Sequence, residues 1–172
     1  MTRWAMRTLR RALVGSMAVI AVFTVSTGTA QAGADNWRTN PELCRSGCST
    51  SAAYISFWQS VLWADNVGGS ISLTFIDGQF GPNTEARTQA WQGIHLDWDG
   101  KPLAKDGRAG PRTWWSAETT YNKNVCTWDS AGNRLCTFYG TAHSFKWGEV
   151  NGSGSDWWFI NPRTNARVSL PA

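Results

Sequence analysis

Apolar residues recur at intervals of three and four between Ser51 and Gly68, which is the spacing of one buried face of an α-helix. Ile55, Leu62 and Trp63 belong to this pattern. Ser51 and the two hydroxyl residues before it can cap the first turn, because their side-chain oxygens accept free backbone N–H groups. We therefore predict a first helix that begins near Ser51 and ends before Gly68.

The next apolar residues alternate with polar ones. Ile71, Leu73 and Phe75 are separated by Ser72 and Thr74. Such alternation is typical of a strand with one buried face. The sequence predicts a short extended segment over residues 71–75.

One phrase occurs twice after this segment. Residues 77–84 read Asp-Gly-Gln-Phe-Gly-Pro-Asn-Thr and residues 106–113 read Asp-Gly-Arg-Ala-Gly-Pro-Arg-Thr, with five positions in common. Glycine can take the positive φ of a tight turn, aspartate can hydrogen-bond the turn backbone, and proline suits the first helical position. Each copy predicts a turn that leads into a helix. We name residues 77–84 the first glycine turn and residues 106–113 the second glycine turn.

The two prolines therefore open two further predicted helices. In the first, Ala86, Ala90 and Trp91 share a face, and Gly93 ends the helix. The second begins at Pro111 and reaches about residue 118, with Trp114 and Trp115 expected to close the core. The sequence thus predicts three helices over residues 51–118.

The pattern changes in the C-terminal part, residues 119–172. Short runs rich in β-branched and aromatic residues are separated by Gly, Asn and Pro turns, which indicates a small antiparallel sheet. The runs are residues 125–128, 134–139, 141–147, 157–160 and 166–170. The predicted fold class is α+β, a three-helix bundle followed by a disulfide-closed β annex.

The N-terminus has the features of an export signal. Residues 1–32 combine four arginines, an apolar stretch and an Ala-Gln-Ala cleavage pattern. General secretion is favoured over the twin-arginine route, and residues 33–50 form a polar N-terminal extension. The four arginines account for the formal net charge of +4, so the exported part is neutral. A neutral chain gives no electrostatic reason to expect nucleic acid or a membrane as partner.

Four cysteines in an exported chain indicate disulfides more than a metal site. Three pairings are possible. We favour Cys44 with Cys48, around a very short loop, and Cys126 with Cys136, across a predicted hairpin. Neither a metal nor a cofactor is expected, and the calcium-loop-like stretch from His95 to Asp106 is interpreted as a solvated turn.

The order of these motifs resembles a known family. Trp58-Gln59, the first glycine turn, Trp91-Gln92 and the second glycine turn ending in Thr113-Trp114 are similar to the peptidoglycan-binding-like domain, a three-helix module of bacterial cell-wall hydrolases. The resemblance covers residues 51–118 and implies a binding groove beside the glycine turns. The segments that join Gln59 to Asp77 and Gln92 to Asp106 are longer than is usual in the family. The candidate ligand-binding residues are Asp77, Gly78, Phe80, Thr84, Gln92, Trp98, Asp106, Gly107 and Thr113.

The tryptophans fit a protein that binds sugars, because indole rings stack on the apolar faces of sugar rings. Trp58, Trp91 and Trp114 have helical spacing and are expected in the core. The better candidates for ligand contact are Trp98, Trp147, Trp157 and Trp158.

Catalytic motifs are scarce. The sequence contains two histidines, no zinc-binding His spacing and no Gly-x-Ser-x-Gly motif. The function predicted is therefore a secreted, monomeric, non-catalytic peptidoglycan-binding protein of the extracellular space or cell wall. Two alternatives stay open: a small cell-wall hydrolase that joins His143, Glu149 and Asp156 in the annex, and an interaction or inhibitor protein that uses the module as scaffold.

Overall fold

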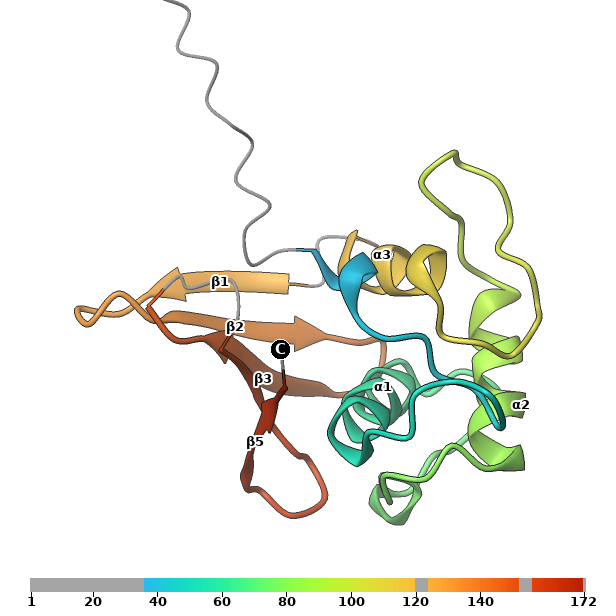
Figure 1. The fold of residues 1–172 in the computed structure, drawn as a ribbon, viewed down its shortest axis with the longest axis horizontal. Helices are drawn as coiled ribbons and strands as arrows, with labels where there is room; N and C mark the ends of the chain where they lie inside the picture. The colour runs from blue at the N-terminus through green and yellow to red at the C-terminus, as the bar shows by residue number, and fades with distance from the viewer. Residues whose placement is uncertain (1–35, 120–123, 152–155, 172) are drawn as a thin grey trace, which may run out of the picture.

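The computed structural model describes residues 36–119, 124–151 and 156–171. The predicted signal peptide, residues 1–32, lies outside the described residues. Helices occupy the N-terminal part and a twisted antiparallel sheet the C-terminal part, so the α+β class and the antiparallel sheet are confirmed (Figure 1). None of the helices described in this structure is long and apolar enough to cross a membrane.

Within the described residues, the α-helices are α1 (Ala52–Asp65), α2 (Pro82–Gln92) and α3 (Pro111–Thr119). All three agree with the predicted helices. Gly81 before α2 has extended backbone and Pro82 is the first helical residue, as the turn chemistry requires. Asn66 ends α1 in the left-handed conformation, with φ of 52°, and its N–H donates to the carbonyl oxygen of Leu62.

The sheet is a meander in which each strand pairs with the next one along the chain. Its strands are β1 (Asn124–Trp128), β2 (Arg134–Tyr139), β3 (Ser144–Glu149), β4 (Trp157–Ile160) and β5 (Arg167–Leu170). Cys126 lies directly opposite Cys136 in the β1–β2 pair, and the two form a disulfide. The second disulfide joins Cys44 to Cys48, so both favoured pairings are confirmed.

The helices and the sheet share one hydrophobic core. Helix α1 lies against one face of the sheet, where Phe57 contacts the rings of Phe145 and Phe159 at centroid distances of 5.8 and 5.3 Å. Trp37, from the short 3-10 helix η1 (Trp37–Thr39) of the predicted N-terminal extension, is buried beside Trp147, with ring centroids 5.3 Å apart. The extension, the helices and the annex are therefore packed as one unit.

The end of α1 also contacts the loop between β2 and β3. The carbonyl oxygen of Ala64 accepts hydrogen bonds from the backbone N–H groups of Ala142 and His143. Gly140 lies so close that an added Cβ would be 2.2 Å from the Ala64 backbone. Only glycine fits this approach of loop to helix.

The predicted extended segment at residues 71–75 is wrong. Leu73–Phe75 forms a 3-10 helix, η2, and Leu73 is 41% exposed. The backbone bends because the N–H of Phe75 donates to the carbonyl oxygen of Ser72. A strand needs a neighbouring strand to accept and donate its backbone hydrogen bonds, and the alternation of apolar and polar residues does not show whether one is present.

The face that Ala86 shares with Ala90 and Trp91 is only partly buried in α2. Ala86 is exposed, and the side chains that face the core with Trp91 are Thr84 and Thr88. Thr88 is tolerated in the core because its Oγ1 accepts a hydrogen bond from Nε1 of Trp58 over 2.9 Å.

The tryptophans divide differently from the prediction. Trp58, Trp91 and Trp114 are buried in the core, as expected. Trp147 and Trp158, predicted as candidates for ligand contact, are also buried, at 2% and 8% exposure. The inner face of β3 carries Trp147 into the core, where its Nε1 donates to Oδ1 of Asn124.

Two further tryptophans are only half-buried. Trp157 stacks on Trp147 at 5.3 Å, and Trp115, predicted to help close the core, lies at its edge. Among the four predicted ligand-contact tryptophans, Trp98 is the exposed one, at 42%.

Candidate functional site

Gln59, in the middle of α1, holds the first glycine turn. Its Oε1 accepts the backbone N–H groups of Asp77 and Gly78 over 3.1 and 2.9 Å. Its Nε2 donates to Oδ1 of Asp77 and to Oγ1 of Thr84. Because Gln59 is 1% exposed, these bonds satisfy an amide that water cannot reach.

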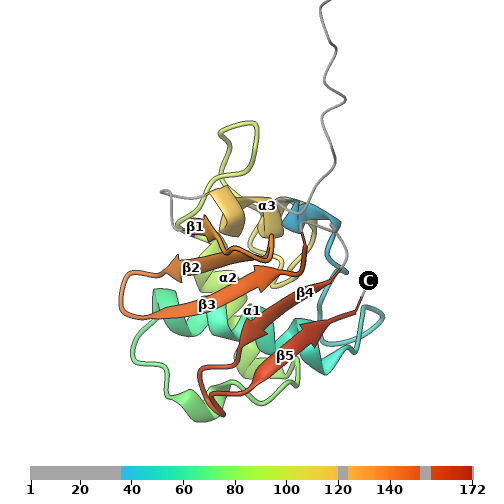
Figure 2. The same ribbon diagram turned by 90° about the vertical axis from the view of Figure 1, so that its left-hand side faces the viewer.

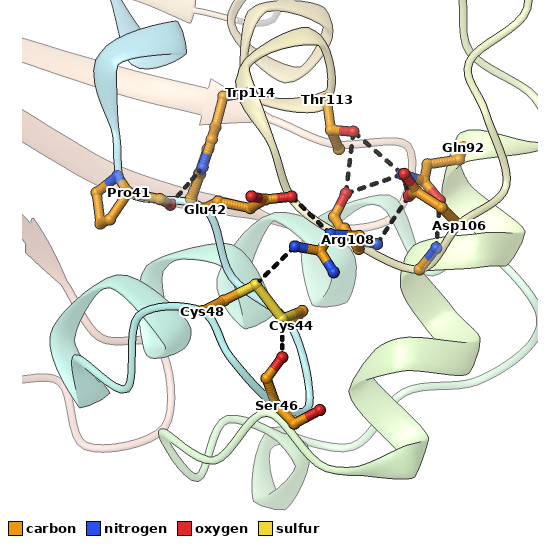
Figure 3. A network of polar contacts seen from close by, with 11 residues as sticks. Pro41, Glu42, Cys44, Ser46, Cys48, Gln92, Asp106, Arg108, Thr113 and Trp114 are labelled. Carbon is orange, nitrogen blue, oxygen red and sulfur yellow. Dashed lines mark hydrogen bonds and ion pairs between the residues drawn. A yellow bond between two sulfur atoms is a disulfide. The ribbon is translucent and has the colours of Figure 1, made fainter.

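Gln92, at the end of α2, holds the second glycine turn in the same way (Figure 3). Its Oε1 accepts the N–H of Gly107 over 2.9 Å, and its Nε2 donates to Oδ1 of Asp106 and Oγ1 of Thr113. The aspartate of each turn also accepts a backbone N–H two residues later, from Gln79 in the first turn and Arg108 in the second. The two turns share one local structure.

This shared frame uses most of the predicted ligand-binding residues. Gly78 and Gly107 take φ of 74° and 73°, and both are buried. The other buried members of the predicted set are Phe80, Thr84, Gln92 and Thr113, whereas Asp77, Asp106 and Trp98 reach the surface. The frame therefore brings two aspartates, one from each turn, to the surface, and the role of the buried residues is to shape the turns.

The two turns differ in side chains that the frame does not use, although the frame uses the backbone at the same positions. Gln79 and Asn83 of the first turn correspond to Arg108 and Arg112 of the second. A groove of about 340 Å³ adjoins the second turn and is lined by Glu42, Trp98, Asp106, Arg108 and Arg112, among others. We name it the second-turn groove. The corresponding groove at the first turn is lined by no arginine, lysine or tryptophan and has Asp77 as its charged residue.

Arg108 is fixed on one side of the second-turn groove. Its Nε donates to Oε1 of Glu42 over 2.6 Å, and one Nη lies 3.1 Å from the sulfur of Cys48 (Figure 3). The hydrogen bond from Arg108 lowers the pKa of Glu42 below its usual value, so this carboxylate is charged at neutral pH. The Cys44–Cys48 disulfide thus supports a residue of the groove.

Arg112 is fixed on the other side by two aspartates. Its guanidinium contacts Oδ2 of Asp97 and lies 3.1 Å from Oδ2 of Asp99. It also covers the ring of Trp98, with the guanidinium carbon 4.5 Å from the ring centroid. Burial raises the pKa of Asp97, but hydrogen bonds from the backbone of Lys101 and Asp99 and from Arg112 outweigh burial, so its pKa is lowered.

The stretch forms a turn, as predicted, but the turn is only partly solvated, because Asp99 is exposed whereas His95 and Asp97 are buried. Oδ1 of Asp97 accepts the N–H groups of Asp99 and Lys101, and both carboxylates face Arg112. Within the described ranges, no group of three or more His, Cys, Asp or Glu side chains converges as a metal site would require.

Sequence reasoning missed Gln59, Glu42, Arg108 and Arg112. Gln59 could have been found from the repeated Trp-Gln pair, since Trp58-Gln59 and Trp91-Gln92 each precede a glycine turn. The arginines could have been found by comparing the turns position by position. The sequence carries no local signal for Glu42, because its partner Arg108 is distant along the chain.

The residues of the alternative catalytic site do not meet. His143 precedes β3 and stacks on Trp63 at 4.3 Å, whereas Glu149 ends β3 and is buried. A six-residue strand is about 20 Å long. His143 is therefore too far from Glu149 to share a proton with it.

Comparison of the chain with protein-family models, curated proteins and solved structures found no match.

Proposed function

We propose that this protein is a secreted, non-catalytic cell-wall-binding protein that holds peptidoglycan in the second-turn groove. The observation that carries the proposal is the difference between two turns of equal structure. The side chains of Trp98, Arg108 and Arg112 take no part in the frame that both turns share, and all three residues line the same groove. The first turn has the same local structure without arginines at these positions, so the turn structure does not require them. The arginines of the second turn are therefore the best candidates for function.

The chemistry of the groove suits peptidoglycan. That polymer combines sugar rings with the amide and carboxylate groups of short peptides. Trp98 offers an indole surface for a sugar ring, and guanidinium groups form paired hydrogen bonds with carboxylates. A guanidinium has five N–H donors, so the contacts of Arg108 with Glu42 and Cys48 leave donors for a ligand.

Preorganisation supports the same proposal. Arg108 and Arg112 are long side chains that lose conformational entropy when a ligand fixes them. Their ion pairs with Glu42 and with Asp97 and Asp99 already hold them in position. Binding therefore costs less entropy than it would with free arginines.

Export to the cell exterior is part of the proposal. It rests on the predicted signal sequence in residues 1–32 and on the two disulfides, which persist in oxidising compartments. The hydrolase alternative has less support, since His143 and Glu149 lie at opposite ends of β3.

Co-sedimentation with purified insoluble peptidoglycan tests the proposal. The protein should sediment with the polymer well above a serum albumin control and release no soluble muropeptides. Sedimentation equal to albumin would contradict binding. Release of muropeptides would favour the hydrolase, and its loss in His143→Ala would locate that activity.

A further inference from the structure

The outer face of the sheet is a second surface with an unusual set of side chains. Helix α1 covers the inner face, and Figure 2 views the outer face with the helices behind the strands. Among the residues that the structure describes, no helix lies over this face. The strand register and the alternation of buried and exposed residues define which residues it presents.

Alternation along the strands sends a mixed set of residues outward. Each strand places its core residues inward, so the residues between them point away from α1. The outward residues are Val125, Thr127, Leu135, Thr137, Tyr139, Ser144, Lys146, Trp158, Ile160, Arg167 and Ser169. Hydroxyl groups and apolar side chains are thus interspersed across all five strands.

The register arranges these residues in rows that cross the sheet. Val125, Thr137 and Lys146 are successive partners on β1, β2 and β3. Tyr139 and Ser144 form a parallel row near the β2–β3 loop. Neighbouring strands are about 4.8 Å apart, so hydrogen-bonding groups repeat at that spacing. A repeating ligand can meet such a surface with a repeating set of contacts.

A groove of about 920 Å³ runs over this face, and we name it the outer-face groove. Three aromatic residues line it, namely Trp63, Tyr139 and Trp158. The ring of Trp63 stacks on His143, and Tyr139 is 51% exposed. Trp158 lies over Gly148, where an added Cβ would be 2.7 Å from the indole ring. The groove is also lined by polar side chains, including Thr127, Thr137, Ser144 and Lys146, and by apolar ones, including Val125, Leu135 and Ile160.

The charge of the groove has one sign. Lys146 is the charged residue among those that line it, and none of the described lining residues is an aspartate or glutamate. Arg167, which also points outward, covers the ring of Trp158 at 4.6 Å. The outward face of the sheet is therefore cationic, although the exported chain as a whole is formally neutral.

We propose that the outer-face groove binds a strand of an acidic polysaccharide, meaning a hydroxyl-rich polymer that carries carboxylate or phosphate groups. The exposed ring of Tyr139 would stack on the sugar or polyol units, the hydroxyl groups of Thr137 and Ser144 would bond to the ligand's hydroxyls, and Lys146 would pair with its anions. The inference concerns a different surface and a different ligand from the second-turn groove, and it does not depend on the proposed peptidoglycan binding.

A polysaccharide fits this face better than a protein partner. Protein interfaces have an apolar centre from which charged residues are depleted and in which lysine and serine are rare. Here Lys146 occupies the middle strand of the sheet, with threonine and serine beside it. A hydroxyl-rich ligand satisfies these groups, whereas an apolar partner would desolvate them.

Affinity electrophoresis of the full exported chain tests the proposal. Native gels would contain polygalacturonate, poly(glycerol phosphate), neutral hydroxyethyl cellulose or poly-glutamate. We expect retardation in the polygalacturonate gel, the poly(glycerol phosphate) gel or both, and this pair distinguishes carboxylate from phosphate as the anion. Lys146→Gln should weaken that binding roughly tenfold, and Lys146→Arg should retain it.

The controls separate this inference from the proposed function. Trp98 lines the second-turn groove and not the outer-face groove, so Trp98→Ala should leave the retardation by the acidic polymers unchanged. Lys146 is exposed, so Lys146→Gln should alter the free energy of unfolding by less than about 0.5 kcal/mol. Three results would overturn the proposal: no retardation in either the polygalacturonate or the poly(glycerol phosphate) gel, retardation of Lys146→Gln equal to that of the wild type, or stronger retardation by poly-glutamate than by either of those two polymers. The last result would indicate an acidic protein partner.

Discussion

Gln59 and Gln92 make matching hydrogen bonds to the two glycine turns. In each case Oε1 accepts the N–H of the turn's first glycine, and Nε2 reaches the turn's aspartate and its threonine. Both amides are 1% exposed. The turns are therefore held from inside the protein, which leaves their outer sides open to ligands.

Loss of either amide should destabilise the fold. Gln59→Leu and Gln92→Leu keep the side-chain size but leave buried N–H groups of the turns without an acceptor. We expect each to lower the free energy of unfolding by about 2–4 kcal/mol in urea denaturation. The control Gln79→Leu, at an exposed position, should cost less than about 0.5 kcal/mol. Equal effects at Gln59 and Gln79 would contradict the role given to the buried amides.

The same frame predicts unequal effects of alanine at two glycines of similar φ. Gly107 and Gly132 have φ of 73° and 78°. A Cβ at Gly107 would lie 2.8 Å from Cγ of Glu85, whereas a Cβ at Gly132 meets nothing within 4 Å. Gly132→Ala should cost about 1 kcal/mol from backbone strain alone. Gly107→Ala should cost at least about 1 kcal/mol more, measured by the same urea denaturation. A cost at Gly107 no larger than at Gly132 would show that the second turn is loosely packed.

Glu118 should make stability depend on pH. Burial raises its pKa from 4.5 to about 7, against a hydrogen bond from the Trp37 N–H and the positive charge of Arg38, which lower it. The folded state binds the proton more tightly than the unfolded state. This contribution to stability is complete below pH 4.5 and is lost as the pH rises through about 7.

Thermal melts of Glu118→Gln across this range measure the effect. The glutamine keeps an acceptor for the Trp37 N–H but carries no charge. It should stabilise the protein by about 1–2 kcal/mol at pH 8 and have little effect at pH 4. A variant that is less stable than the wild type at pH 8 would show that the charged form of Glu118 is favoured in the fold.

The fold could be predicted from sequence where one residue type determines a local geometry. Pro82 and Pro111 mark the first residues of α2 and α3, and the hairpin between Cys126 and Cys136 follows from turn residues flanked by β-branched runs. These features depend on neighbours in the chain. Features that depend on distant contacts were harder to predict.

Trp147 illustrates such a distant contact, although part of the signal was present. Phe145 and Trp147 alternate with Ser144 and Lys146, which indicates that the two aromatic residues share the inner face of β3. At Trp157-Trp158 no such signal exists, because two adjacent tryptophans must point to opposite faces. Burial there depends on packing: Trp158 lies over Gly148 and is covered by Arg167.

The candidate site was predicted only in part for the same reason. Asp106 follows from the repeated phrase, Gln92 from the resemblance, and Trp98 from the expectation that indole rings stack on sugars. The arrangement of Arg108 with Glu42 and the Cys44–Cys48 disulfide depends on the N-terminal segment lying beside the second turn (Figure 3). No pattern within either segment indicates that contact.

A binding isotherm on insoluble peptidoglycan tests the central claim most directly, using substitutions at equivalent positions of the two turns. Trp98→Ala combined with Arg108→Gln should weaken binding by at least roughly tenfold, since stacking and a charged hydrogen bond are both lost. The matched variant of the first turn, Gln79→Ala with Asn83→Ala, should bind like the wild type. Equal weakening by the two double variants, or unchanged binding by the Trp98 and Arg108 variant, would contradict a site in the second-turn groove.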